Sequence, residues 1–312
     1  MNNAKKFKII IIHLHSGLGN QLFQFNYLNH LRRKYNIKKV YFDLRSYYPG
    51  FMDKLLRKTY HHKLIRKYRM DLYLDRIIKL DKINSVLVRF ISKIRKYNSK
   101  KYNFCLLPVT ITDKRYKDET LLSKSRVLFL SGVFLDRNLI NNDTIDVLRK
   151  SRTEIMKGKL DNFNFKNSVS VHIRGGDVID IKRNKDYIQP LTVNYYKKAI
   201  EVIQNRIMSP FFIIFSNDDR YAESIFSELQ IENYKIIRRA DYNDLEALYI
   251  MSYCNHNIIA NSSYSYWAAV INDNKDKIVI CPEYFLKPHH FLYQTVQNLP
   301  FNDWISINNW GA

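Results

Sequence analysis

The stretch Ser168-Val-Ser-Val-His-Ile-Arg-Gly-Gly-Asp177 decides the fold of this 312-residue chain. Apolar β-branched residues alternate in it, as in a buried strand of an α/β sheet. The predicted strand carries His172, Arg174 and Asp177 into a double-glycine turn. Ligands of open α/β sheets bind where strands end, and an arginine beside glycines is suited to holding a phosphate. An ordinary strand and turn with one surface arginine explains the stretch equally well, so other segments have to decide.

A second segment of this kind is Lys8-Ile-Ile-Ile-Ile-His-Leu-His-Ser-Gly-Leu-Gly-Asn-Gln21. The isoleucines predict a buried strand, and the Gly17-Leu-Gly19 turn leads into an apolar-patterned helix. A strand, a glycine turn and a helix N-terminus together form a phosphate cradle. The third glycine of the dinucleotide fingerprint is missing, and so is the Gly-Lys-Ser/Thr of a phosphate-binding loop. A turn that only reverses the chain is the alternative.

A third segment, Ile258 to Ile271, predicts a short strand followed by a helix from Tyr264 onward. Polar residues that favour helix N-caps crowd its start. They are Asn261, Ser262, Ser263 and Ser265. Hydroxyls beside the free N–H groups of a helix start suit a phosphate, whereas capping alone needs only one of them.

Between these segments, Pro210 to Asp219 predicts a strand that ends in adjacent carboxylates. Asp218 and Asp219 are placed either to accept hydrogen bonds from a purine or a ribose hydroxyl, or to cap a helix that starts near Tyr221. Further acids precede the next helix, where we expect one to cap it and the others to face the cleft. These acids are Asp241, Asp244 and Glu246.

Four motifs now stand in a recognisable order. They are Gly17-Leu-Gly-Asn-Gln21, His172-Ile-Arg-Gly-Gly-Asp177, Phe215-Ser-Asn-Asp-Asp219 and Asn261-Ser-Ser-Tyr-Ser-Tyr-Trp267. In this order they resemble the α-1,2-fucosyltransferases of glycosyltransferase family 11, and the chain is similar to bacterial members that decorate O-antigen. The resemblance implies an α/β, GT-B-like fold of two Rossmann-like lobes with a cleft between them. It also implies inverting, metal-independent transfer of L-fucose from GDP-β-L-fucose to the 2-hydroxyl of a β-galactoside.

The resemblance further implies residue roles. Arg174 is expected to stabilise the leaving β-phosphate, Asp177 to brace its turn and His172 to contact the fucose or the ribose. The donor is expected to lie on Gly17, Gly19, Asn20, Gln21, Asp218, Asp219, Asp244, Asn261, Ser262, Ser263, Tyr264, Ser265 and Trp267. His15 and Asp43 are candidate general bases, and a largely dissociative reaction needs no strong base.

The chain departs from the usual family pattern at four positions. Ser16 replaces the first glycine of Gly-Gly-Leu-Gly-Asn-Gln, and Gly175 replaces the second arginine of His-x-Arg-Arg-Gly-Asp. Asn217 interrupts Ser-Asp-Asp, and Tyr266 replaces the first tryptophan of Ser-Trp-Trp. The glycine removes one cation from the predicted diphosphate site and leaves Arg174 as its main cation.

Length and a hydrophobic content of 46% allow one large domain or two medium ones. We expect an acceptor-side lobe over 1–155 and a GDP-sugar-binding lobe over 156–312, joined by the polar linker 157–167. The net charge is +22, and residues 1–100 hold 24 Lys and Arg against 5 Asp and Glu. Much of this excess lies in the segment 54–101, whose helix-like pattern fits either the surface of an anionic membrane or an ordinary solvated face.

No apolar run approaches the ~20 residues of a membrane span, and no signal peptide is evident. We therefore expect a cytoplasmic protein, with the inner membrane face as a site of peripheral contact. The cysteines Cys105, Cys254 and Cys281 match neither a disulfide framework nor a zinc site, and the last two are expected in the core. No Asp-x-Asp occurs, so no metal cofactor is expected. A glycosyltransferase with another nucleotide sugar, and a basic nucleic-acid-binding protein without a recognisable module, are the alternatives.

Overall fold

The computed structural model describes residues 8–44, 81–82, 109–175, 186–188 and 191–309. It forms two compact units, Met1–Leu135 with Leu139–Thr144, and Asp136–Asn138 with Ile145–Ala312. The sequence-predicted boundary at residue 155 lies at the end of helix α6 (Asn142–Met156), most of which belongs to the second unit.

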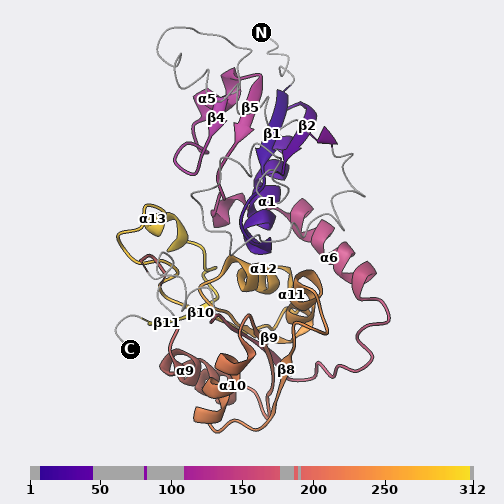
Figure 1. Cartoon of the computed structure of the whole chain (residues 1–312), viewed down its shortest axis with the longest axis vertical. Helices are drawn as coiled ribbons and strands as arrows, with labels where there is room; N and C mark the ends of the chain where they lie inside the picture. The colour runs from indigo at the N-terminus through magenta and orange to yellow at the C-terminus, as the bar shows by residue number, and fades with distance from the viewer. Residues whose placement is uncertain (1–7, 45–80, 83–108, 176–185, 189–190, 310–312) are drawn as a thin grey trace, which may run out of the picture. The chain divides into compact units, whose positions relative to one another are not determined.

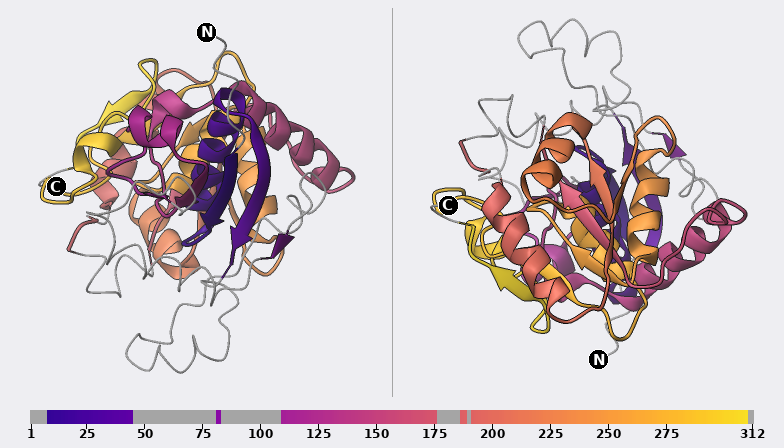
Figure 2. Two further views of the ribbon diagram at one scale, coloured as in Figure 1. Left: turned by 90° about the horizontal axis from the view of Figure 1, so that it is seen from above. Right: turned by 90° about the horizontal axis from the view of Figure 1, so that it is seen from below.

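The first unit contains a parallel sheet with β1 at its centre, in the strand order β3-β2-β1-β5-β4 (Figure 1). Figure 2, left, shows β1 and β2 side by side. The described elements of this unit are β1 (Lys8–His13), α1 (Leu18–Lys34), β2 (Ile37–Asp43), β3 (Asp81–Lys82), β4 (Val109–Ile111), α5 (Glu119–Lys124) and β5 (Val127–Leu130). The predicted isoleucine strand and the helix after the glycine turn are therefore confirmed.

The second unit contains a parallel sheet in the order β11-β10-β9-β6-β7-β8. Its strands are β6 (Ser168–Ile173), β7 (Phe211–Ser216), β8 (Tyr234–Ile237), β9 (His256–Ile258), β10 (Val279–Pro282) and β11 (Ile305–Ile307). Its helices are η1 (Arg137–Leu139), α6, α9 (Val193–Gln204), α10 (Asp219–Glu228), α11 (Asp244–Tyr253), α12 (Ser263–Ile271) and α13 (Tyr293–Val296). Helices α9 and α10 cover one face of this sheet, and α11 and α12 cover the other (Figure 1).

The alternation within β6 explains why both of its faces are buried. Val169, Val171 and Ile173 join the apolar core beneath α9 and α10. Ser170 and His172 point to the opposite face, where each has a hydrogen-bonding partner: Asn257 donates to the Ser170 hydroxyl over 2.7 Å. Polar residues on a buried strand cost little when they are paired in this way.

Cations stabilise the C-terminal end of α12. Arg149 donates to the Ile271 carbonyl over 3.0 Å, and Lys277 donates to the carbonyls of Ala269 and Asn272. Burial lowers the pKa of Lys277 to about 8, and the nearby Arg149 charge adds to this effect. Positive groups at the carbonyl end of a helix interact favourably with its dipole. These contacts therefore stabilise α12, the helix whose N-terminal turn the sequence identifies as a candidate phosphate site.

The α/β class with two Rossmann-like units that the sequence predicts is confirmed, because both described sheets are parallel and carry helical crossovers. Cys254 and Cys281 are buried free thiols, as expected. Among the helices that the structure describes, none combines the length and the apolar character that crossing a lipid bilayer requires.

Candidate functional site

The second sheet reverses its strand order between β6 and β9. From β6 the chain adds β7 and β8 on one side, then returns to add β9, β10 and β11 on the other. All pairings among these strands are parallel, so their carboxyl ends lie at one edge. Such a switch point is where open α/β sheets bind ligands. Arg174 directly follows β6 at this place.

The Arg174 side chain reaches across the switch point. One terminal guanidinium nitrogen donates to the carbonyl of Asn261, which follows β9, over 3.3 Å. The side chain remains half-buried, so part of it faces solvent. A guanidinium stays charged and presents several donors in one plane, which suits the oxygens of a phosphate. The position and the chemistry of Arg174 therefore agree.

His172 lies behind Arg174 as a buried support. Its Nδ1 shares a hydrogen bond of 2.8 Å with the Ser265 hydroxyl on α12, and its backbone carbonyl accepts one from the Tyr196 hydroxyl on α9 over 3.2 Å. Burial raises the pKa of Tyr196, so its hydroxyl stays protonated and continues to donate. The His172 side chain is only 7% exposed. As the structure stands, it connects β6 with α12 and presents little surface to a ligand.

The start of α12 is capped as the sequence predicts. Ser262 is the N-cap, and its hydroxyl accepts from the backbone N–H of Tyr264 over 3.3 Å. Ser262, Ser263 and Tyr264 are half-buried, whereas Ser265 is buried and its hydroxyl accepts from the Ala260 N–H. The positive end of the α12 dipole and these polar groups therefore lie close to Arg174, which bonds to the neighbouring Asn261.

Two predicted donor-binding residues have no exposed surface. Gln21 on α1 and Trp267 on α12 are both 0% exposed. Trp267 packs within the α12 face, and the Gln21 amide nitrogen donates to the Ser16 carbonyl over 3.1 Å. In the conformation described, both side chains support the backbone that carries the site.

The carboxylates after β7 divide between the two predicted roles. Asp218 is the N-cap of α10 and accepts from the Tyr221 N–H over 3.1 Å. Asp219 lies in the first turn of α10, with one oxygen 3.6 Å from an Arg238 nitrogen and the other buried without a hydrogen bond to a described residue. Capping therefore accounts for Asp218, whereas the buried oxygen of Asp219 has no hydrogen-bond donor among the described residues.

The cap of α11 agrees with the prediction only in part. Asn243 is its N-cap, and its side-chain oxygen accepts from the N–H groups of Leu245 and Glu246. The Glu246 carboxylate, at the third helical position, accepts from the Asn243 N–H and completes a capping box, so one of the predicted acids does take part in the cap, although the N-cap residue is Asn243. Asp244 begins the helix; its carboxylate lies 3.7 Å from Arg239, and its carbonyl accepts from the Tyr264 hydroxyl.

The glycine turn of the first unit lies at the carboxyl end of β1. Gly17 is the N-cap of α1 and has no side chain to cap it, and the N–H groups of Asn20 and Gln21 bond to the Gly17 carbonyl. Gly19 is buried in the first turn, and Asn20 is half-buried beside it. From α1, Gln24 donates to the carbonyls of His13 and Gly132, over 3.1 and 2.8 Å.

Ser16 adopts a left-handed backbone conformation with φ of 72°. Glycine reaches this region without strain, whereas a residue with a Cβ pays roughly 1–2 kcal/mol. The departure from the usual glycine therefore falls at the position where glycine is favoured. The Ser16 hydroxyl shares a 3.0 Å hydrogen bond with Nδ1 of His15, which offsets part of the cost.

The two candidate bases differ in accessibility. Asp43, the last residue of β2, is 1% exposed. His15 is half-buried, and burial lowers its pKa below the ordinary value while the Asp113 carboxylate raises it in part. His15 is therefore neutral near neutral pH, the form that accepts a proton.

Asp177 and nearly all of the basic segment 54–101 lie outside the described residues. Among the residues that are described, no three His, Cys, Asp or Glu side chains are grouped as a metal site requires. The absence of a metal from the reaction stays a prediction.

A family model described as glycosyl transferase family 11 matches residues 8–308. The chain belongs to this family. It is therefore an enzyme, a glycosyltransferase. Family membership favours this class over the alternative of a basic nucleic-acid-binding protein.

Two curated relatives come from Escherichia coli. This glycosyltransferase is 27% identical to the O-antigen biosynthesis glycosyltransferase WbnK, over 94% of its own chain and 99% of the relative. It is 29% identical to an α-1,2-colitosyltransferase, over 88% of its own chain and 91% of the relative.

Similar solved structures include a family 9 glycosyltransferase from Veillonella parvula, at TM-score 0.49 and 10% identity, covering 100% of this chain and 89% of that one. The fucosyltransferase NodZ from Bradyrhizobium has TM-score 0.42 and 8% identity, covering 85% and 92%. At this level of similarity they bear on neither the substrate nor the role of any residue.

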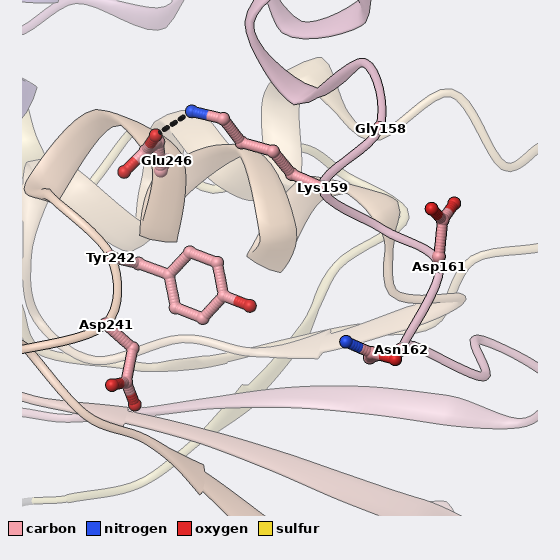
Figure 3. Close-up of a pocket in the computed structure, with 7 residues that line it drawn as sticks. All are labelled: Gly158, Lys159, Asp161, Asn162, Asp241, Tyr242 and Glu246. Carbon is pink, nitrogen blue, oxygen red and sulfur yellow. Dashed lines mark hydrogen bonds and ion pairs between the residues drawn. The ribbon is translucent and has the colours of Figure 1, made fainter.

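The glycosyltransferase also has a polar hollow of ≈ 420 Å³ that the sequence does not predict (Figure 3). It lies between the linker after α6 and the start of α11, and Figure 3 shows Lys159 reaching to Glu246, with which it forms an ion pair. The other lining residues are Gly158, Asp161, Asn162, Asp241 and Tyr242. None of the predicted donor-binding residues lines this hollow.

Sequence reasoning missed three residues that hold the predicted turns. Asn217 bonds to the backbone of Gly175, the Tyr221 ring lies against Gly175, and Gln24 ties α1 to two loops. The position of Asn217 inside a motif was a usable signal, because its amide offers both a donor and an acceptor. The spatial partners of Tyr221 and Gln24 leave no such mark in the sequence.

Proposed function

We propose that this glycosyltransferase transfers L-fucose from GDP-β-L-fucose to the 2-hydroxyl of a terminal β-galactoside in a bacterial surface glycan. The observation that carries the proposal is Arg174, a cation anchored at the switch point of the second sheet beside the serine-capped start of α12. Membership of family 11 and a relative named for O-antigen biosynthesis support the reaction class and the kind of acceptor.

The donor diphosphate is held mainly by the second unit in this proposal. Arg174 contributes a full positive charge, and Ser262 and Ser263 contribute hydroxyls at the positive end of α12. As the bond from sugar to phosphate breaks, negative charge grows on the leaving β-phosphate. Arg174 then binds the transition state more tightly than the ground state, which is the condition for acceleration.

The acceptor belongs to the first unit in the GT-B scheme that we infer. The galactose 2-hydroxyl attacks the anomeric carbon on the face opposite the leaving diphosphate, so the configuration inverts. If the hydroxyl proton needs a base, His15 is favoured over Asp43, because His15 is more exposed and its lowered pKa keeps it neutral.

Charge neutralisation by protein groups makes a metal unnecessary in this mechanism. The absence of any Asp-x-Asp pair from the sequence supports this part of the proposal. We expect the same turnover with excess EDTA as with added Mg²⁺ or Mn²⁺, and a loss of activity in EDTA that Mn²⁺ restores would contradict it.

The runner-up is the same transfer with another activated sugar. The relative named an α-1,2-colitosyltransferase makes colitose the specific alternative. Competition between activated fucose and activated colitose, each at equal concentration, separates the two by the product formed.

The direct test is incubation with GDP-fucose and a panel of β1,3- and β1,4-galactosides, followed by linkage analysis of the product. An α-1,2-linked fucose on galactose is expected. Thermal unfolding with GDP, UDP or CDP tests the donor class separately, and stabilisation by UDP alone would exclude GDP-fucose as the donor.

We further propose peripheral binding of the cytoplasmic membrane face through the basic segment 54–101. Its excess of Lys and Arg over Asp and Glu attracts anionic lipid, at about 1 kcal/mol for each basic residue at the surface. Co-sedimentation with vesicles of anionic lipid, weakened by salt, is expected. Equal sedimentation with purely zwitterionic vesicles would contradict the proposal.

A further inference from the structure

Two of the four departures from the family pattern touch each other. The Asn217 side-chain oxygen accepts from the Gly175 N–H over 2.9 Å, and its amide nitrogen donates to the Gly175 carbonyl over 3.3 Å. The backbone pairing of β6 with β7 ends at Ile173 and Ser216, two residues before Gly175 and one residue before Asn217. The Asn217 side chain therefore extends the contact between these strands beyond the sheet, past Arg174.

Arg174 lies between two tethers as a result. Its guanidinium bonds to Asn261 beyond β9, and the residue that follows it is bonded to Asn217 beyond β7. Because β9 and β7 flank β6 on opposite sides, the two tethers hold the turn from both directions. A side chain held in this way loses little further freedom when it meets a ligand.

The space around Gly175 shows why the turn is tight. A Cβ at this position would lie 2.9 Å from Cδ1 of Tyr221 and 3.1 Å from Cβ of Asp218. Tyr221 has limited room to yield, since its N–H bonds to Asp218 and its hydroxyl donates to the Leu191 carbonyl over 3.1 Å. The φ of Gly175 lies outside the left-handed region, so closeness rather than backbone conformation requires the glycine.

We propose that Asn217 is a positioning residue that holds the turn of Arg174 so that the guanidinium meets the donor diphosphate. This inference rests on the proposed function. Asparagine suits the task because one short side chain supplies the acceptor and the donor that the Gly175 backbone needs. Asn217 acts through Arg174 and makes no contact with the donor itself.

The test is a double-mutant cycle with GDP affinity, measured by calorimetry, as the readout. The proteins are the full-length wild type, Arg174→Ala, Asn217→Ala and the double variant. Asn217→Ala is expected to weaken GDP binding about tenfold in the wild-type background, and no more than about twofold when Arg174 is already absent. Turnover of Asn217→Ala is expected to fall between about tenfold and a hundredfold.

Asn233→Ala is the matched control. Asn233 is also exposed, and its side chain donates to a backbone carbonyl, that of Pro210 just before β7. The control removes a comparable hydrogen bond at the end of β7 opposite to Asn217 and Arg174. GDP affinity is therefore expected to stay unchanged, whereas the thermal midpoint is expected to shift as it does in Asn217→Ala.

The outcomes separate the two proposals. Equal weakening by Asn217→Ala in both backgrounds would overturn the positioning role, with the donor assignment intact. Should the wild type bind UDP or CDP and not GDP, the donor assignment fails, and the same cycle run with the nucleotide that binds still decides the role of Asn217. No binding of any of the three by the wild type would overturn the proposed function and this inference with it.

Discussion

The turns after β1 and after β6 occupy equivalent places in their two units. Each follows the strand at the reversal of strand order, and each is tied across that reversal by a side chain that donates to a carbonyl. In the first unit Gln24 bonds to the Gly132 carbonyl beyond β5. In the second unit Arg174 bonds to the Asn261 carbonyl beyond β9.

The two turns differ in charge. Residues 13–24 contain no lysine or arginine, so neutral amides hold the first turn, whereas a guanidinium holds the second. Equivalent positions at the reversal of strand order therefore do not give the two turns identical chemistry. Only the second tether brings a full positive charge to the ligand edge, which is why we place the diphosphate there and the acceptor on the first unit.

Removing the positive charge of Arg174 is the most direct test of the difference between the two turns. Arg174→Ala is expected to lower turnover by about 10²–10³, because a donor aimed at the charge of the transition state is worth that much. The thermal midpoint is expected to change little, since the side chain is half-buried. Steady-state kinetics measures the effect, with exposed Arg206→Ala as the control. Turnover near that of the wild type would disprove the assignment of Arg174.

The first turn is tested through His15. His15→Gln is expected to lower turnover by roughly tenfold to a hundredfold, at the low end of general-base contributions. Because burial lowers the pKa of His15, wild-type activity should fall on acidification only below the ordinary histidine pKa of 6.5. The variant should lose this acid limb. A pH–rate profile of unchanged shape in the variant would assign the limb to another group.

Gly175→Ala tests how closely the turn after β6 is packed against Tyr221. The added methyl would crowd Tyr221, and overpacking of this kind costs about 1–3 kcal/mol. We expect turnover and the thermal midpoint to fall together. In Gly175→Ala/Tyr221→Ala the ring is gone, so the double variant should be less impaired than the two separate losses predict. Strict additivity in unfolding measurements would show that the two residues do not interfere.

Ser16→Gly has the smallest expected effect. It relieves the left-handed strain at the first turn but loosens the unfolded chain and removes a hydrogen bond to His15, so the gain in unfolding free energy is below about 1 kcal/mol. Ser125→Gly in the same unit is the control, and it should destabilise because its φ is −82°. A loss of stability in Ser16→Gly equal to that of the control would mean that the strain is absent.

Local sequence patterns were enough to predict strands and helices and some of their ends. Alternation predicted β6, the isoleucine run predicted β1, and the surplus of serines identified the capped start of α12. The cap of α11 was predicted only in part, because Glu246 takes part in the capping box while the N-cap position itself falls on Asn243, directly before the acid Asp244. Residue preferences rank the candidate N-cap residues, but they do not determine at which of these residues the helix begins.

Strand, turn and helix start are properties of neighbouring residues, so the amino-acid order alone established two parallel α/β units, with Arg174 at the end of a buried strand. The partners of that arginine came only with folding. Asn261 and Asn217 are 87 and 43 residues away in the chain, and they reach the Arg174 turn because β9 and β7 pair with β6. Pairing across a sheet depends on which strands become neighbours, and no local pattern encodes that choice.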